Sequence, residues 1–261
     1  MRFSRYLNET IAVVRELLVS RSAFTAALLI LPYAGVLIGL DVAGHYGAIT
    51  HADLPVQFNL ASDGGFGEWL EYSLTASVAI MLILIWRSDQ DWTYLANALL
   101  FLWLTLDNSA EIHEQTGQWL APILDAIPGL PIAGQDIGEA FLFLLIGVVW
   151  LAGLGLSLKN AQIRPALYSL LLACCIAMAA IFGVIVDILV AAGTYTPAQL
   201  EIVTFIEDGG EFAMICISFI VMVAIFDTER KHQAANAKSQ PIGNRHSALI
   251  QSPLNHSARQ L

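Results

Sequence analysis

The chain has 261 residues, of which 57% are hydrophobic and 13% are charged, and its formal net charge is −10. Soluble domains carry about 25% charged residues, so this composition and the mean hydropathy of +0.65 indicate a membrane protein. The acidic balance excludes a nucleic-acid-binding function of the usual kind, which needs clustered Lys and Arg. The three cysteines, Cys174, Cys175 and Cys216, lie in apolar runs and are expected to be packing residues.

Residues 1–21 are predicted to form a cytoplasmic amphipathic helix that lies on the membrane surface. Its apolar residues recur at helical spacing: Phe3, Leu7, Ile11, Val14 and Leu18. A cleaved signal peptide is the weaker alternative, because the long apolar run begins only after Arg21.

The segment 22–226 is predicted to be an all-α, polytopic membrane domain, a bundle of six transmembrane helices. A membrane-spanning helix needs about 20 mostly apolar residues. The segments that meet this length are 22–43, 66–87, 92–113, 137–158, 165–192 and 202–226.

The basic residues predict the orientation of these six spans. All twelve Lys and Arg lie before the first span, between spans 2 and 3, between spans 4 and 5, or after span 6. The connections at 44–65, 114–136 and 193–201 contain none. Cytoplasmic loops are enriched in Lys and Arg, so both termini are expected in the cytoplasm and the protein in a bacterial inner membrane.

Two other segments carry expectations of their own. The stretch "WLAPILDAIPGLPIAG", 119–134, is apolar and contains three prolines, so it is expected to form an interfacial or re-entrant cap. The polar segment 227–261 is predicted to be a disordered cytoplasmic tail near anionic lipid.

With this orientation, acidic residues gather at the outer end of every span. The residues predicted to form a site there are Glu68, Glu71, Asp107, Glu111, His113, Glu114, Glu139, Asp187, Glu207, Asp208 and Glu211. Pairs such as Glu111/Glu114 and Asp208/Glu211 have the i,i+3 spacing of one helical face. An ionised carboxylate at membrane depth costs up to ~3 kcal/mol, and no Lys or Arg lies on that side. These carboxylates are therefore expected either to be protonated or to bind a cation.

A purely structural role is the alternative for some of the acids. Glu68, Asp136, Glu139 and Glu207 could stabilise the N-termini of their helices. Asp41, Asp53, Asp63 and Asp125 are expected to be solvated loop acids. His45 and His51, in the first outer loop, could fold over the site.

Many oxygen donors with one or two imidazoles favour a divalent cation such as Mg, Ca, Mn or Fe, whereas zinc prefers more His or Cys. The metal, whether Fe, Mn, Zn or Ca, is left open. Glu114 and His113 are the candidate catalytic residues for proton transfer. The acidic pairs in the segments "EWLE", "EIHE" and "DGGE" lack the Glu-x-x-His pattern of di-iron bundles.

The segments "GEWLEYSLTA" and "LTLDNSAEIHE" resemble a set of uncharacterised multi-span bacterial inner-membrane proteins. In those proteins an acidic ExxEY pair opens one span and an LD-x3-E-I-H-E motif ends the next. The resemblance covers spans 2 and 3. It implies that the motif of Asp107, Glu111, His113 and Glu114 is shared, and it implies no particular activity.

Three functions fit these features. The first is a membrane metalloenzyme, oxidative or hydrolytic, that acts at the outer leaflet on a lipid-like, membrane-dissolved substrate. The second is a cation- or proton-coupled transporter, although the inner halves of spans 4 and 5 offer no polar path. The third is an assembly or docking protein, and a GxxxG at Gly35 and Gly39 would permit close contact in a homo-oligomer.

Overall fold

A computed structural model of the chain describes residues 2–50, 55–60, 62, 64–129 and 132–239. Helices form all the regular structure in these ranges. In chain order the elements are α1 (Arg2–Leu18), α2 (Arg21–Thr50), the 3₁₀ turn η1 (Val56–Phe58), α3 (Phe66–Asp89), α4 (Trp92–Ala110), α5 (Ile112–Leu124), α6 (Gly134–Leu158), α7 (Ile163–Ala180), the π-helical η2 (Ile181–Val186), α8 (Asp187–Ala192) and α9 (Pro197–Ser239).

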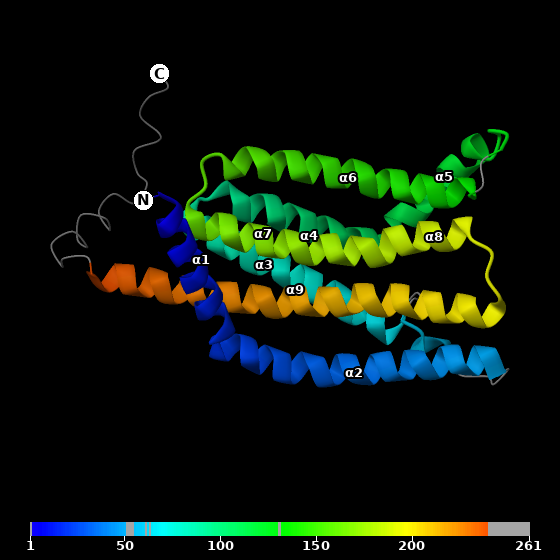
Figure 1. The fold of residues 1–261 in the computed structure, drawn as a ribbon, viewed down its shortest axis with the longest axis horizontal. Coiled ribbons are helices and arrows are strands. Elements are labelled where there is room, and N and C mark those ends of the chain that lie inside the picture. The colour runs from blue at the N-terminus through cyan, green and yellow to red at the C-terminus, as the bar shows by residue number, and fades with distance from the viewer. Residues whose placement is uncertain (1, 51–54, 61, 63, 130–131, 240–261) are drawn as a thin grey trace, which may run out of the picture.

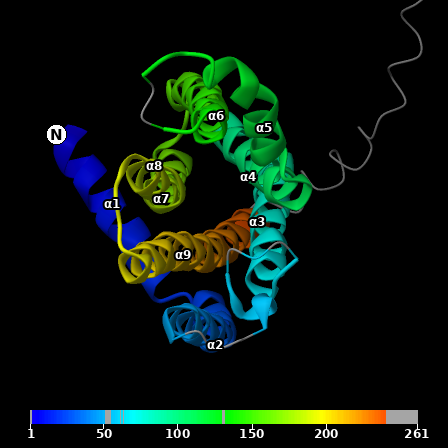
Figure 2. The same cartoon turned by 90° about the vertical axis from the view of Figure 1, so that its right-hand side faces the viewer.

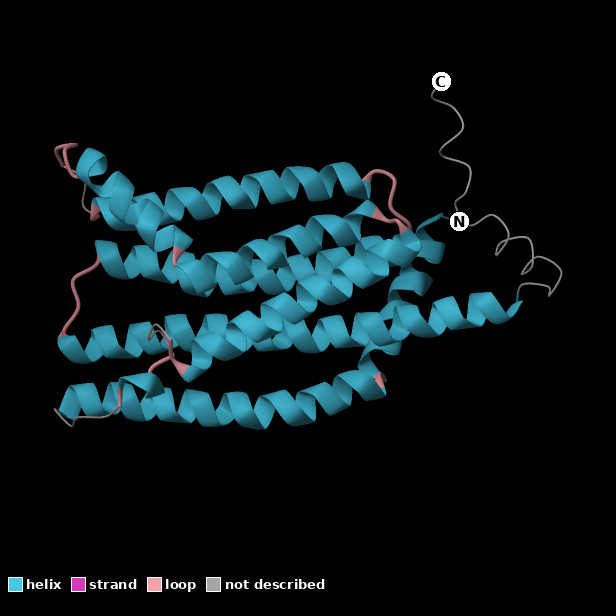
Figure 3. Ribbon diagram, turned by 180° about the vertical axis from the view of Figure 1, so that it is seen from behind, coloured by secondary structure: helices cyan, strands magenta, loops and turns pink. Residues whose placement is uncertain are grey.

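The long helices run side by side as one bundle, and the loops lie at its two ends (Figures 1 and 3). Seen end-on, α9 lies between α2, α3 and α7 (Figure 2), and it packs against all three. We call the end that carries α5 the acidic end and the end crossed by α1 the basic end. In Figure 1 these are the right and left ends.

Five of the helical segments described are long and apolar enough to cross a membrane: Arg21–Thr50, Phe66–Asp89, Gly134–Leu158, Ile163–Ala192 and Pro197–Asn236. The third predicted span, α4, is not among them, although it runs along the other helices. Its apolar character is reduced by Thr93, Asn97 and Asp107, whose side chains are buried inside the protein. The chain is therefore an all-helical protein with several candidate membrane helices.

Several helix boundaries differ from those predicted. The first span was expected over 22–43, but α2 runs from Arg21 to Thr50, so His45 lies in this helix and not in the first outer loop. The third span was expected to continue to residue 113, but α4 ends at Ala110 and the chain turns at Glu111, which has a φ of 50°. The last helix was expected over 202–226, but α9 begins at Pro197 and continues to Ser239. A disordered tail from Asp227 is therefore not seen up to Ser239, and residues 240–261 lie outside the described residues.

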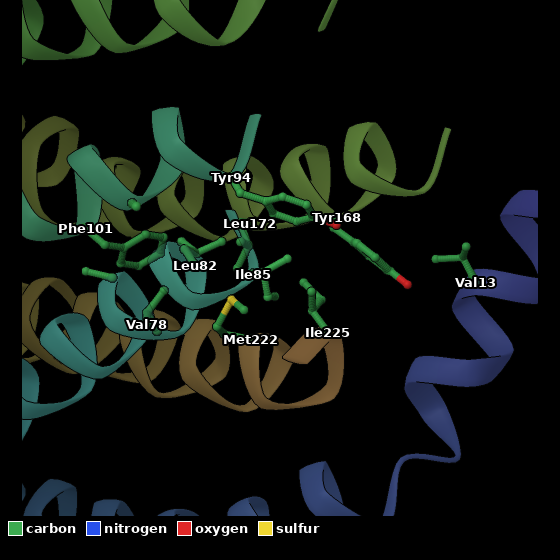
Figure 4. Packing of buried hydrophobic residues seen from close by; sticks show 12 residues of the cluster. Val13, Val78, Leu82, Ile85, Tyr94, Phe101, Tyr168, Leu172, Met222 and Ile225 are labelled. Carbon is green, nitrogen blue, oxygen red and sulfur yellow. The ribbon is translucent and has the colours of Figure 1, made fainter. Parts of the chain in front are cut away.

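The hydrophobic core lies toward the basic end. It joins Leu82 of α3, Phe101 of α4, Leu172 of α7 and Met222 of α9, all at most 1% exposed (Figure 4). Val13 of α1 belongs to the same cluster, which attaches α1 to the bundle.

The rest of α1 has the character predicted for a surface helix. The apolar side chains of Leu7, Ile11, Val14 and Leu18 are exposed. An ion pair fixes the polar side, because Arg164 Nη1 of α7 lies 2.7 Å from Glu16 Oε2. His232 Nε2 of α9 lies 3.2 Å from the same oxygen, so three helices meet at Glu16.

Candidate functional site

A cavity of about 380 Å³ opens between α3, α5, α6, η2 and α9 at the acidic end of the bundle. Nine carboxylates line it: Glu68, Glu71, Glu114, Asp136, Glu139, Asp187, Glu207, Asp208 and Glu211. His113 lines it as well, and no Lys or Arg is present among its wall residues. We call this space the acidic cavity.

The acidic cavity collects most, but not all, of the residues that the sequence predicted for a site. Asp107 and Glu111 are not among its wall residues. Asp107 is fully buried and bound to His113, whereas Glu111 is exposed at the turn between α4 and α5. Asp136, which the sequence assigned to the start of a helix, lies in the wall.

The turn at Glu111 explains why the predicted helical spacing fails here. Because α4 ends before Glu111 and α5 begins after it, Asp107, Glu111 and Glu114 do not share one helical face. Asp107 holds the two helices together instead. Its Oδ1 accepts the backbone N–H of His113 at 3.0 Å, and its Oδ2 lies 3.1 Å from His113 Nδ1.

Two glycines let α5 pack closely on α6 beside the cavity. A Cβ atom on Gly138 would lie 2.9 Å from the Cα of Gly117, and one on Gly117 would lie 2.6 Å from the Cγ of Glu139. Glu139 accepts a hydrogen bond from Gln135 Nε2 at 2.9 Å. The close helix crossing therefore brings Glu114 of α5 and Glu139 of α6 to one wall.

The opposite wall depends on the π-helical segment η2. A Cβ atom on Gly183 would overlap the carboxylate of Glu211 on α9, and one on Gly210 would overlap the ring of Phe182. Single π-helical turns inside α-helices are frequent at functional sites. Here η2 and its glycine make room for the Glu211 carboxylate at the cavity wall.

Some of the acids predicted to stabilise helix N-termini lie in the first turn of a helix, and others do not. Glu68 lies in the first turn of α3, and its Oε2 accepts the N–H of Gly64. Asp136 lies in the first turn of α6. Glu139 and Glu207 have no such role, because Glu139 lies beyond the first turn of α6 and α9 begins ten residues before Glu207, at Pro197.

A second acidic group near this end was not recognised from the sequence. Asp41, predicted to be a solvated loop acid, is instead fully buried in α2, and its Oδ1 accepts the N–H of Leu60 at 2.9 Å. His45 Nε2 lies 3.5 Å from the same oxygen, and His45 Nδ1 lies 2.7 Å from Glu201 Oε2 of α9. The i,i+4 spacing of Asp41 and His45 is the signal that could have revealed this link.

The remaining loop residues have mixed outcomes. Asp125 was expected to be solvated, but its Oδ1 accepts the N–H of Gly134 at 2.7 Å, which joins the end of α5 to the start of α6. His51, Asp53 and Asp63 lie outside the described residues. The first part of the stretch 119–134, which was predicted to form a cap, belongs to α5. This helix continues to Leu124 and packs on α6.

The carboxylates surround the acidic cavity without converging on one point. In the described part of the chain, no group of three His, Cys, Asp or Glu side chains is close enough to hold a metal ion. Oδ2 of Asp208 is buried and has no hydrogen-bond partner in that part of the chain. The cavity thus presents many carboxyl oxygens, which can accept from a ligand that carries positive charge or N–H donors.

Comparison with known proteins adds the family. No curated protein and no solved structure matches the chain. A family profile matches residues 24–225, which include every wall residue of the acidic cavity. The chain belongs to the family described as a domain of unknown function (DUF8692).

Proposed function

We propose that the acidic cavity binds divalent cations and that the chain is a membrane metalloenzyme acting on a lipid-like, membrane-dissolved substrate. One observation carries the proposal: nine carboxylates and no Lys or Arg line a single cavity. Carboxylates crowded in this way repel each other and are costly to bury. A bound divalent cation offsets both effects.

The charged walls face each other across the cavity. Glu71 of α3 interacts electrostatically with Glu211 and Asp208 of α9. Among the described residues no three His, Cys, Asp or Glu side chains are close enough to hold an ion directly. An ion would therefore bind through water molecules or after rotation of these side chains. Mg²⁺ commonly keeps several waters, and Ca²⁺ accepts six to eight oxygens in flexible geometry. An oxygen-rich wall with one imidazole favours such hard cations, or Mn²⁺ and Fe²⁺, over zinc.

Two wall residues are suited to proton transfer. His113 is oriented by Asp107, in the way that a buried carboxylate often fixes a functional histidine. Glu114 lies next to it in the same wall. In the proposed enzyme, Glu114 and His113 would move protons to or from the molecule in the cavity, and a cation held by the wall carboxylates would supply Lewis-acid chemistry there.

The proposed setting is a bacterial inner membrane, with six spans, both termini in the cytoplasm and the acidic cavity on the periplasmic side. The distribution of Lys and Arg supports it, because Arg87, Lys159, Arg164 and Arg230 all belong to the basic end of the bundle. α4 is the span with least support, since its composition alone does not qualify it.

The transporter alternative is less well supported. Between the acidic cavity and the basic end lies the core formed by Phe101, Leu172, Met222 and their neighbours. A transporter needs a path or an inverted repeat across the midplane, and this tightly packed apolar core offers no polar path. A docking role is also less well supported, because the carboxylates line a cavity and do not form a rim.

Elemental analysis of the purified full-length protein tests the proposal. The test variant is Glu71→Gln with Glu211→Gln, which removes two facing charges, and the control is Glu9→Gln on α1, outside the cavity. We expect a stoichiometric divalent metal in the wild type and control, and its loss in the double variant. Iron or manganese would indicate oxidative chemistry, zinc hydrolysis, and calcium a structural role. A metal content that is unchanged in the double variant, or the same lack of metal in all three proteins after purification without chelators, would overturn it.

A further inference from the structure

An apolar groove runs from the acidic cavity along the side of the bundle. Its volume is about 720 Å³, and its walls are α6 on one side and α7, η2 and α8 on the other. Four residues line both spaces: Asp136, Ala140, Phe143 and Val184. The groove and the acidic cavity are therefore adjacent.

The groove walls are apolar over nearly their whole length. Asp136, at the end that meets the acidic cavity, is the only polar side chain among the described residues that line it. Several wall residues are widely exposed, including Leu144 at 65% and Ile185 at 51%. An open apolar groove on a membrane bundle is accessible from the hydrocarbon region of the bilayer.

The dimensions match a lipid chain. The α6 wall extends from Ile137 to Leu151, which corresponds to about 21 Å at 1.5 Å per residue. One leaflet contributes about half of the roughly 30 Å hydrocarbon thickness. A single alkyl chain can therefore lie along the groove with its head group in the acidic cavity.

Charge selects the head group. The described wall residues include nine carboxyl groups and neither Lys nor Arg, so the cavity favours a head group with positive charge or N–H donors. An anionic head is repelled there, whereas an amine supplies both a positive charge and N–H donors.

We propose that the groove between α6 and α7–η2–α8 takes the hydrocarbon chain of a membrane amphiphile whose head group carries a positively charged amine, and that this amine enters the acidic cavity. This inference deepens the proposed function and rests on the acidic cavity being its ligand site. It names the substrate class as an amine-headed lipid that reaches the site sideways from the bilayer. A transmembrane helix or a second copy of the chain could cover the groove, but neither would place a charge in the cavity.

Photo-cross-linking to the full-length protein in phosphatidylcholine vesicles tests this inference. Three probes share one long alkyl chain with a photoactivatable group and differ only in the head: amine, hydroxyl or carboxylate. We expect the amine probe to label groove residues such as Leu144 and Val184 about tenfold more than the carboxylate probe, which corresponds to about 1.4 kcal/mol. The hydroxyl probe should lie between them.

The matched variants are two glycines of α6. A Cβ atom meets nothing within 4 Å at either Gly147, which lines the groove, or Gly155, which does not. Gly147→Phe should reduce the labelling by the amine probe strongly, and Gly155→Phe should leave it unchanged. Ala140→Leu, at the junction of the two spaces, is the second blocking variant if Gly147→Phe does not fold.

Several outcomes would overturn the inference: equal labelling by all three heads, labelling spread over every lipid-facing helix, labelling that neither blocking variant reduces, or cross-links through the groove between two copies. The same measurement with a chelator separates the two proposals. If the protein binds no cation but the amine probe still labels the groove, only the metal function fails. If cations bind but labelling ignores the head group, only the present inference fails.

Discussion

Asp107 binds His113 through both of its oxygens, across the break between two helices. Its Oδ1 accepts the backbone N–H of His113 at 3.0 Å, and its Oδ2 lies 3.1 Å from the ring Nδ1. Asp107 is fully buried near the end of α4. His113 lies in the first turn of α5, on the wall of the acidic cavity. Asp107 is therefore a positioning residue, which fixes the direction of α5 and the orientation of the His113 ring.

Asp107→Ala should lower the free energy of unfolding by about 1–3 kcal/mol, because it leaves the buried N–H of His113 without its acceptor. Reversible unfolding measures this change, in mixed micelles that contain an increasing fraction of a denaturing detergent. Asp107→Asn keeps one acceptor oxygen for the backbone N–H and should lose less. Equal stability of wild type and Asp107→Ala would show that the contact does not hold α5 in place.

Glu111→Gly should be neutral or stabilising by up to about 1 kcal/mol. Glu111 has a φ of 50°, a left-handed conformation that costs a residue with a Cβ roughly 1–2 kcal/mol, and the greater chain entropy of glycine offsets part of the gain. The same unfolding assay applies. Gln118→Gly, within α5, is the control and should be destabilising by about 1 kcal/mol. Loss of stability on Glu111→Gly comparable to that of the control would contradict the left-handed turn.

Gly183→Ala should weaken cation binding, because the added methyl group overlaps the carboxylate of Glu211 and forces it to move. Stability should change little, since that carboxylate is the end of a flexible side chain. Gly147→Ala is the matched control, since a Cβ there meets nothing within 4 Å. The control should be stabilising by roughly 0.5–1 kcal/mol, as alanine generally is in a helix. Calorimetric titration with Mn²⁺ and thermal unfolding test both variants, and identical behaviour of the two would refute the packing of Glu211 on η2.

The attachment of α1 should weaken in acid. Hydrogen bonds from Arg164, and then from His232, lower the pKa of the Glu16 carboxyl below its usual value of 4.5. Burial raises this pKa, but the bonds from Arg164 outweigh it. A carboxyl whose pKa is lowered in the folded state stabilises that state fully above its usual pKa, and this contribution is lost as the pH falls through the lowered pKa.

The wild type should therefore exceed Glu16→Gln in stability at neutral pH, and the difference should shrink as the pH falls below 4.5. Unfolding midpoints measured across this range provide the test. A difference between wild type and Glu16→Gln that is constant with pH would contradict the ion pair.

Hydrophobicity and helical periodicity were enough to predict most of the fold. They predicted the all-helical class, several long apolar helices and the gathering of acids at one end, because each depends on composition within a single segment. Such patterns do not reveal a single left-handed residue. Glu111 lies in an otherwise helical run, so the end of α4 and the separate roles of Asp107 and Glu111 could not be read from spacing.

Packing between helices accounts for the other differences. Asp41 follows an apolar run and was expected to be solvated, but the N–H of Leu60 and the ring of His45 surround it in the folded protein. The extension of α9 beyond Asp227 likewise depends on partners, since Gln233 of α9 donates a hydrogen bond to Ser88 of α3. The contacts of Asp41 with Leu60 and of Gln233 with Ser88 join residues that are not neighbours in sequence, and a single sequence carries no record of them.

The central claim is that the acidic cavity binds divalent cations. The most direct test is titration of the full-length protein with Mn²⁺, followed through the loss of the paramagnetic signal of free Mn²⁺. We expect saturable binding in the wild type and in Glu9→Gln, and binding weakened at least about tenfold in Glu71→Gln/Glu211→Gln, because each removed charge contributes about 1 kcal/mol or more at short range. Equal binding by all three proteins, or no binding by any, would contradict the claim.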